Sequence, residues 1–454
     1  MTAAALSPLE ELAERAVAEA RRRAPSAKVE VYAASGEDRT VELREGRLES
    51  LQRSAGGGVG VRVLEGERCG FAYSVGVDLE GALDAFARAR AQLSCVSPDP
   101  NRTLPAPCRA VAPAGLLESL TDPSLFQAPL HDVLPRLRAM EAQAASGGPR
   151  IGKVLRASYG ESRGETVLRT STGAAFRQEG THCSAGLSVT AVSGGEIQVG
   201  SAAVSGRRFT DLDLDGVGKD AAWRAAAVLD GRKLPTARRS IVFDPWVAGE
   251  LMDLIAGLLS AEEVQRGKSL LAGKAGRRVA SPLVSIIDDP LIPGGLASCV
   301  EDDEGVPARR KTLIEAGVLR EYFHDSYTAA KDKVATNASA GRASFRGTPG
   351  PGPTNFFLAP GPMTRDALIA STVDGVLALE LMGMHMVDPI SGELSVGVSG
   401  IAIEGGRLTH AVKGAMLAGS LLELLEKVDG VADDLTFYGS LAAPTFRASD
   451  MTLA

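Results

Sequence analysis

ETVLRTSTGAAFRQEGTHCSAGLSVTAVSGGEIQVGSAAVS, residues 165–205, is a series of short segments separated by turns at Thr172-Gly173 and Gly194-Gly195. Apolar and polar residues with a period of two, broken by glycine-rich turns, are typical of half-buried antiparallel strands. A helical pattern follows around residues 220–229. We therefore expect several strands followed by a helix. The predicted strands are 165–170, 174–179, 182–192 and 197–205.

The same order of segments occurs earlier in the chain. Alternating apolar residues mark strands at 29–33, 41–43 and 59–63, and an Ala/Leu-rich helix follows at 79–93. The glycine-rich stretch Gly56–Gly60 leads into a strand and not into a helix, so we interpret it as a flexible strand junction and not as a phosphate-binding loop. The two copies predict a structural repeat.

A proline-rich stretch, Ser97–Pro113, separates the copies and is predicted to be an extended connection, followed by a helix at 132–145. Another change of pattern occurs near Pro235. We therefore predict an N-terminal α+β region, 1–236, with modules at about 1–96 and 114–236, and a C-terminal mixed α+β domain, 237–454.

The C-terminal part mixes strands and helices. Hairpins are predicted at 311–323, around Glu315-Ala316-Gly317, and at 401–412, around Gly405-Gly406. Because strands and helices do not alternate strictly, we expect an α+β fold and not a doubly wound α/β fold. Helices are predicted at 246–259, 364–372 and 419–428.

Composition excludes several classes of function. The 454 residues carry a formal net charge of -7, which disfavours binding to nucleic acid. The five cysteines are odd in number and form no CxxC pair, which is typical of a reducing compartment. The N-terminus is amphipathic, with a capping box at Ser7 and Glu10, and no apolar run is long enough to cross a bilayer. We expect a cytoplasmic protein without a membrane partner.

Candidate chemical groups are dispersed. The smallest separation between two histidines is 25 residues, between His385 and His410. None of the histidines is therefore expected to be a metal ligand on its own. The run Glu301–Glu304 lacks the spacing of a calcium loop and is interpreted as a solvated turn. Arg309-Arg310-Lys311 is likewise expected to be solvated. His324-Asp325-Ser326 is not expected to be a triad, because sequence neighbours point to different faces and a triad is assembled from distant segments.

Several short motifs follow one another in the C-terminal part: Asp302-Asp303-Glu304-Gly305-Val306-Pro307, Val318-Leu319-Arg320-Glu321-Tyr322 with Asp325, Ala329 and Lys331, Pro353-Thr354-Asn355 with Pro360-Gly361, Ser391-Gly392, and Val412-Lys413-Gly414. In order and spacing this series resembles the TldD/PmbA metalloprotease family, also called the modulator of DNA gyrase family. With the N-terminal strands, the similarity covers nearly the whole chain. The stretch Leu379–Gly383 and the Gly439-Ser440 tail are more similar to the PmbA (TldE) branch than to TldD.

In this family the proteolytic subunit carries His-Glu-x-x-x-His on the first helix of the C-terminal region and a further cysteine ligand near the C-terminus. Alignment on the surrounding residues places the ends of this motif on Met252 and Gly257, with Asp253 at the glutamate position. The last cysteine of the chain is Cys299, and the tail reads Phe437-Tyr438-Gly439-Ser440. The resemblance therefore implies no catalytic residues, no zinc and no other cofactor in this chain.

The branch implies a heterodimer with a zinc-bearing TldD-type paralogue and an unfolded peptide as substrate. Exposed strand edges would hold such a peptide through its backbone. Two alternatives stay open. One is an independent hydrolase in which Asp253 and the run Glu301–Glu304 bind a divalent ion, and the other is a peptide-binding protein that forms a homodimer when alone.

Overall fold

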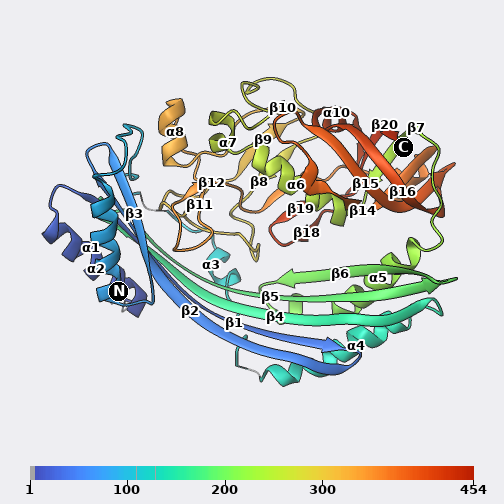
Figure 1. The fold of residues 1–454 in the computed structure, drawn as a ribbon, viewed down its shortest axis with the longest axis horizontal. Helices are drawn as coiled ribbons and strands as arrows, with labels where there is room; N and C mark the ends of the chain where they lie inside the picture. The colour runs from blue at the N-terminus through green and yellow to red at the C-terminus, as the bar shows by residue number, and fades with distance from the viewer. Residues whose placement is uncertain (1–5, 109, 128) are drawn as a thin grey trace.

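The computed structural model describes residues 6–108, 110–127 and 129–454. Its N-terminal half builds one antiparallel six-stranded sheet in the order β3-β2-β1-β4-β5-β6, which curves beneath the C-terminal half (Figure 1). Its strands are β1 (Lys28–Arg44), β2 (Arg47–Glu65), β3 (Arg68–Val75), β4 (Ile151–Thr170), β5 (Ala175–Ser193) and β6 (Glu196–Gly206). The predicted repeat is confirmed, but the short predicted strands are parts of longer ones, of 17 residues in β1 and 19 in β2.

Each module places two helices on the sheet. They are α1 (Pro8–Arg23) and α2 (Leu79–Gln92) in the first module, and α4 (Leu134–Ala145) and α5 (Leu214–Ala227) in the second. The capping box at α1 is confirmed, because Ser7 Oγ accepts a hydrogen bond from the amide of Glu10, whose side chain accepts one from the amide of Ser7. The two helix pairs lie at opposite ends of the sheet (Figure 1).

The two ends of the sheet have separate apolar cores. The core beneath α4 and α5 includes Val41 and Leu43 of β1, and the core beneath α1 and α2 includes Val167 of β4. Between the cores, four neighbouring strands each place a glycine in the same row, Gly56 opposite Gly36, Gly36 opposite Gly164, and Gly164 opposite Gly180. Each module therefore contributes residues to the core of the other.

The proline-rich connection has neither helix nor strand at its described positions, 97–108 and 110–113, as predicted. It is held against the C-terminal half: the Tyr327 hydroxyl donates to Asp99 at 2.7 Å, and the Arg102 guanidinium stacks 3.7 Å from the ring of Tyr327. Short helices near this connection and after β6 are α3 (Leu116–Ser119), η1 (Leu130–Val133) and η2 (Phe209–Asp211).

The C-terminal half contains two further six-stranded sheets. The first, in the order β16-β15-β14-β7-β20-β17, closes into a barrel because β16 also pairs with β20. The second has the order β10-β9-β8-β13-β19-β18. The barrel strands are β7 (Ala237–Phe243), β14 (Asp374–Met382), β15 (Glu393–Glu404), β16 (Arg407–Ser420), β17 (Val428–Val431) and β20 (Phe446–Leu453). The others are β8 (Ile286–Asp288), β9 (Lys311–Glu315), β10 (Val318–Leu319), β13 (Phe356–Leu358), β18 (Thr436–Tyr438) and β19 (Leu441–Ala443).

A pair of two-residue strands, β11 (Ala340–Gly341) and β12 (Gly350–Pro351), lies apart from these sheets. The helices are α6 (Pro245–Leu258), α7 (Ala261–Gln265), α8 (Ser326–Asp332), α9 (Arg365–Ala370), η3 (Met384–Met386) and α10 (Leu421–Glu426). Both predicted hairpins and the three predicted helices are present, and the α+β fold class is confirmed. In the described part of the chain, no helix is both long and apolar enough to span a membrane.

The interpretation of Gly56–Gly60 as a strand junction is wrong, because these residues lie inside β2 and pair with β1. Two of the glycines are required by a close approach. A Cβ on Gly58 would lie 2.2 Å from Cε2 of Phe345, and one on Gly60 would lie 2.4 Å from the carbonyl oxygen of Phe345. The absence of side chains here lets a loop of the C-terminal half rest on the sheet.

Gly58→Ala is therefore expected to lower the free energy of unfolding by about 1–3 kcal/mol, because the added methyl group would clash with the Phe345 ring and with the carbonyl oxygen of Ser74 on β3, 2.4 Å away. Gly56→Ala is the matched control, since a Cβ there meets nothing within 4 Å. Urea denaturation of both variants measures the difference. Equal stability of the two variants would show that the close approach of Phe345 to the sheet does not require a glycine at position 58.

Candidate functional site

Helix α6 carries the positions at which the sequence resemblance places the family's zinc motif. It begins where Asp244 accepts a hydrogen bond from the amide of Trp246, with Pro245 at the first helical position. Met252 is only 2% exposed and packs into the apolar core, whereas Asp253 and Gly257 face outward. Of the two positions aligned with the histidines of the motif, Met252 is therefore buried and Gly257 is exposed.

The C-terminal tail lies next to this helix. Strands β18 and β19 both pack against α6, and the ring centroids of Trp246 and Tyr438 are 4.8 Å apart. The turn between the two strands is Gly439-Ser440, where the resemblance expects a cysteine. The fold thus brings the tail to the motif helix, as a metal site built from both segments requires.

The side chains at these positions do not fit a zinc ion. Met252 offers a thioether that is turned into the core, Gly257 offers no side chain, and the Gly439-Ser440 turn offers no thiolate. Over the ranges 6–108, 110–127 and 129–454, no group of three or more His, Cys, Asp or Glu residues could hold a metal ion.

The acidic run Glu301–Glu304 is not a solvated turn, which corrects the prediction. Asp302 is 4% exposed and Glu304 is fully buried, because the run packs against the N-terminal sheet. The Asp302 carboxylate accepts hydrogen bonds from the backbone amides of Glu304, Val306 and Ala340. These bonds replace the lost solvent and fold the run into a tight turn.

Buried ion pairs join the sheet to this run. Arg62 of β2 lies between Glu30 of β1, at 2.6 Å, and Glu304, at 3.0 Å. Arg342 also pairs with Glu30, and its backbone amide donates to Asp303 at 2.6 Å. Burial raises the pKa of Glu30, but Arg342 and Arg62 together hold it below its ordinary value.

The basic run Arg309-Arg310-Lys311 is solvated only in part. Arg309 and Arg310 are exposed, but Lys311 is 1% exposed, and its Nζ lies 3.0 Å from Asp288 and 3.2 Å from the carbonyl oxygen of Ala338. Thr354 donates its backbone amide and its hydroxyl to the same Asp288. Lys311, Asp288 and Thr354, the last a residue of the motif series, thus form buried polar contacts within the C-terminal half.

The tripeptide His324-Asp325-Ser326 also has structural contacts. Asp325 caps α8 by accepting from the amide of Thr328 at 2.8 Å, and the amide of Ser326 donates to Glu304. His324 is buried beside the ring of Tyr322, and burial lowers its pKa. These contacts are consistent with the interpretation that the tripeptide is not a catalytic triad.

Sequence reasoning missed Glu30, Arg62 and Arg342. Glu30 and Arg62 occupy the polar positions of the apolar–polar alternation, which by itself predicts a side of the strand that faces solvent. In the structure this side of the sheet faces the C-terminal half, and Glu30 and Arg62 lie directly opposite each other in the β1–β2 pair. The opposite charges of Glu30 and Arg62, within the mainly apolar segments 29–33 and 59–63, are the one indication of their pairing in the sequence.

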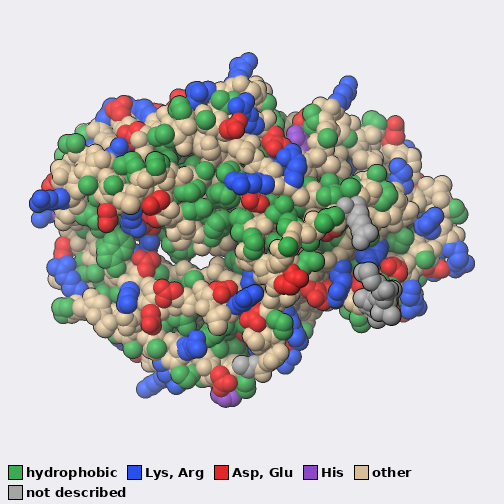
Figure 2. Space-filling model, turned by 180° about the vertical axis from the view of Figure 1, so that it is seen from behind, with side chains coloured by type: hydrophobic (Ala, Val, Ile, Leu, Met, Phe, Trp, Pro, Cys, Tyr) green, Lys and Arg blue, Asp and Glu red, His purple; other side chains and the backbone are tan. Residues whose placement is uncertain are grey.

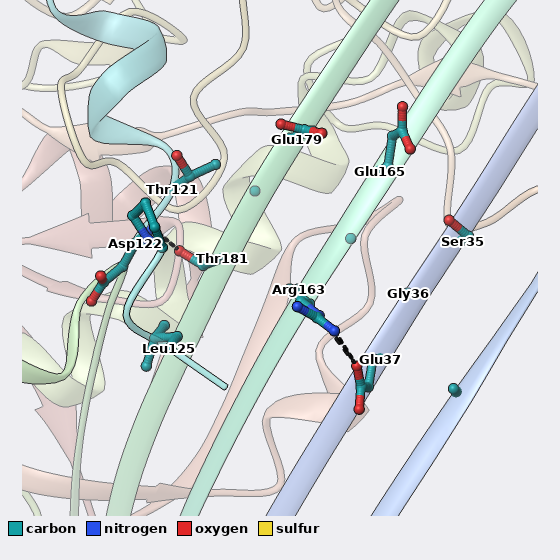
Figure 3. A pocket seen from close by; sticks show the side chains of 14 residues that line it. Ser35, Gly36, Glu37, Thr121, Asp122, Leu125, Arg163, Glu165, Glu179 and Thr181 are labelled. Atoms are coloured by element: carbon teal, nitrogen blue, oxygen red, sulfur yellow. Dashed lines mark hydrogen bonds and ion pairs between the residues drawn. The ribbon is translucent and has the colours of Figure 1, made fainter. Parts of the chain in front are cut away.

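Three cavities lie on the large sheet. One of about 260 Å³ and a groove of about 730 Å³ share Thr166 and Arg342 in their walls and lie at the junction with the C-terminal half. A third, of about 550 Å³, lies between β1, β4 and β5 and the Thr121–Leu125 loop (Figure 3). There Arg163 binds Glu37 at 2.8 Å, and Arg177 binds Glu165 at 2.7 Å. These charges are engaged in pairing across strands.

An opening passes between the two halves of the molecule, with hydrophobic side chains around it (Figure 2). The sheet also ends at an edge strand, β6, on which Ile197 is 63% and Val199 is 52% exposed. An edge strand presents unpaired backbone N–H and C=O groups that an extended peptide can join.

Comparison with known proteins identifies the family to which this chain belongs. Family models of the PmbA/TldA metallopeptidases match three parts of the chain: domain 1 at residues 29–93, the central domain at 123–229 and the C-terminal domain at 236–454. The chain belongs to the PmbA/TldD metalloprotease family.

Individual relatives match along nearly the full length. A metalloprotease TldD homologue from Haemophilus influenzae is 29% identical, with 89% of this chain and 85% of that protein aligned. The metalloprotease PmbA of Escherichia coli O157:H7 is 26% identical, with 98% and 96% aligned. The crystal structure of TldE from Thermococcus kodakarensis has the same fold, with a TM-score of 0.87 at 21% identity, covering 98% of this chain and 100% of that one.

Proposed function

We propose that this chain is the noncatalytic, PmbA/TldE-type subunit of a heterodimeric zinc metalloprotease that cleaves small or unfolded peptides in the cytoplasm. The observation that carries the proposal is the state of the motif helix. Met252 is turned into the core, Gly257 has no side chain, and the neighbouring turn is Gly439-Ser440. Each position at which the family places a zinc ligand lacks a suitable donor.

A TldD-type paralogue would supply the zinc ion and the glutamate that activates its bound water. This chain would then complete the enclosure around the substrate. The opening between its halves and the β6 edge support that role, since an unfolded peptide can be held there through its backbone, independently of its sequence.

The competing hypothesis of an independent hydrolase requires Asp253 to act with the run Glu301–Glu304. Asp253 lies on the outward face of α6, whereas Asp302 and Glu304 are buried and bonded to backbone amides or arginines. No described group of acidic residues joins them at one site. The arrangement therefore favours the noncatalytic role.

The test compares this chain alone, a TldD-type paralogue alone, and the two expressed together. Elemental mass spectrometry measures zinc per chain, and mass spectrometry of an unstructured peptide measures cleavage. We expect no bound zinc in this chain alone, one zinc per heterodimer, and cleavage only when both chains are present. Replacing the motif glutamate of the paralogue by glutamine should abolish the cleavage.

Asp253→Ala in this chain is the informative control. The mixture should retain its activity, since the proposal gives Asp253 no catalytic role. One tightly held zinc in this chain alone, or cleavage by this chain alone that is lost in Asp253→Ala, would overturn the proposal in favour of an independent enzyme. A homodimer that forms no complex with the paralogue would favour a peptide-binding protein.

A further inference from the structure

The outer face of the barrel carries a group of exposed methionines, Met382, Met386 and Met416, here called the thioether cluster. These residues are 44%, 74% and 39% exposed, respectively. Elsewhere in residues 6–108, 110–127 and 129–454 the methionines are buried or half-buried. The exposed thioethers of the described chain are therefore concentrated at one place, although they come from segments that are distant in sequence.

Strand pairing brings two of these methionines together. Gly397 of β15 pairs with Met382 of β14 on one side and with Met416 of β16 on the other (Figure 1). The preceding Leu381 and the following Leu417 lie in the apolar core, so both methionines point out of the barrel. Two interstrand spacings, about 10 Å, separate their Cα atoms. Because the residue between them is a glycine, no side chain at that position keeps the two methionines apart.

Met382 already extends over this gap. A Cβ built on Gly397 would lie 3.1 Å from Cε and 3.3 Å from Cβ of Met382, so the methionine fills the space that a side chain at position 397 would need. Met386 approaches from the turn after β14, where its backbone amide donates to the carbonyl oxygen of Gly383 at 2.9 Å. Its Sδ lies 3.7 Å from the place of a Cβ on Gly383. The turn thus folds a third thioether back onto the end of β14, next to Met382.

The chemistry of these side chains selects one kind of ligand. Thioether sulfur is a soft ligand that favours Cu(I), whereas carboxylate and carbonyl oxygens favour Mg²⁺ and Ca²⁺. A methionine is unbranched and has three rotatable bonds, so its sulfur can turn toward an ion without a change of the backbone. His385, exposed in the same turn, offers an imidazole, which also suits copper. The exposed Glu380, two residues before Met382, adds a negative charge that favours a cation.

We propose that the thioether cluster binds one monovalent copper ion through the sulfur atoms of Met382, Met386 and Met416. This site is separate from the degenerate zinc motif of α6, where the thioether of Met252 is turned into the core. The sulfur atoms of the thioether cluster belong to exposed residues, so an ion from solution can reach them. The bound ion would join the turn after β14 to β16.

Methyl NMR of the full-length protein, labelled with ¹³C in the methionine methyl groups, tests this inference. N-ethylmaleimide first blocks the accessible thiols, because Cys95 and Cys108 are exposed and thiolates also bind Cu(I). One equivalent of Cu(I), added without oxygen, should shift the signals of the three cluster methionines and leave those of the buried Met140 and Met451 in place. The same amount of Zn²⁺ should shift none of them.

Met382→Leu combined with Met416→Leu removes two sulfur atoms and keeps the apolar volume, an exchange that proteins usually tolerate. Competition with bicinchoninate, a coloured Cu(I) chelator, should show an affinity lowered about tenfold or more, since losing a contact that only supports a metal ligand already costs that much. Met363→Leu, at a half-buried methionine before α9, is the matched control and should bind Cu(I) like the wild type.

Two results would contradict the copper site. Methyl signals of the thioether cluster that do not move with Cu(I) would show that these sulfur atoms bind no ion. An affinity for Cu(I) that is unchanged in the double variant would place the ion on other residues. Neither measurement depends on whether the chain has a proteolytic partner.

Discussion

Arg62→Ala is expected to lower the free energy of unfolding by about 3–5 kcal/mol, the range typical for removing one partner of a buried ion pair. The side chain of Arg62 is 4% exposed and lies between Glu30 and Glu304, each 1% exposed. Its removal leaves two buried carboxylates close together, and Glu30 then keeps its ion pair with Arg342. Chemical denaturation monitored by circular dichroism measures the change.

Arg53→Ala is the matched control for this prediction. Arg53 lies on the same strand and also pairs with a carboxylate, Glu37, but its side chain is 68% exposed. An exposed pair contributes about 0–1 kcal/mol, so the control should unfold close to the wild type. If the two variants lose similar stability, burial of the Arg62 network does not fasten the two halves together.

Lys311→Met should have an effect of similar size, also about 3–5 kcal/mol at neutral pH, because it leaves Asp288 buried without its cation. Both side chains of this pair are fully buried, with Nζ 3.0 Å from the carboxylate. Burial already raises the pKa of Asp288 even though Lys311 and Thr354 lower it. Without Lys311 the pKa should rise further.

The sign of the pH dependence of Lys311→Met follows from this rise. A carboxyl group with a raised pKa in the folded state destabilises the fold when ionised, so the variant should recover stability as pH falls toward 5. Arg310→Met, at an adjacent exposed position, should change little. The double variant Lys311→Met with Asp288→Asn should recover much of the loss. A defect that is independent of pH and persists in the double variant would mean that packing, and not charge, is responsible.

Local patterns were sufficient for much of the fold. The Ser7 capping box, the Gly405-Gly406 hairpin and the helix predicted at 246–259 each depend on residues close in sequence. Strand lengths were underestimated because residues 34–40 of β1 have no alternation of apolar and polar side chains. This part of β1 crosses the glycine row between the two cores, where neither pair of helices covers the sheet, so no face requires apolar residues.

The site was predicted only where its evidence is local. The placement of Met252, Asp253 and Gly257 on one helix followed from the surrounding sequence. The burial of Glu304 and Lys311 did not, because their partners are distant: Arg62 is 242 residues from Glu304. A run of charges is usually solvated, and only the tertiary structure shows which charges have buried partners.

The exchange of core residues between the modules has a consequence for how the chain acquired and keeps its architecture. Val41 and Leu43 complete the second core, and Val167 completes the first. A polypeptide cut at the proline-rich connection would leave each piece with an unfinished interior and with one long strand, β1 or β4, lacking its neighbour. The tandem repeat is thus a single folding unit. If it arose by duplication, the ancestral half would have needed a second copy of itself to form a stable structure.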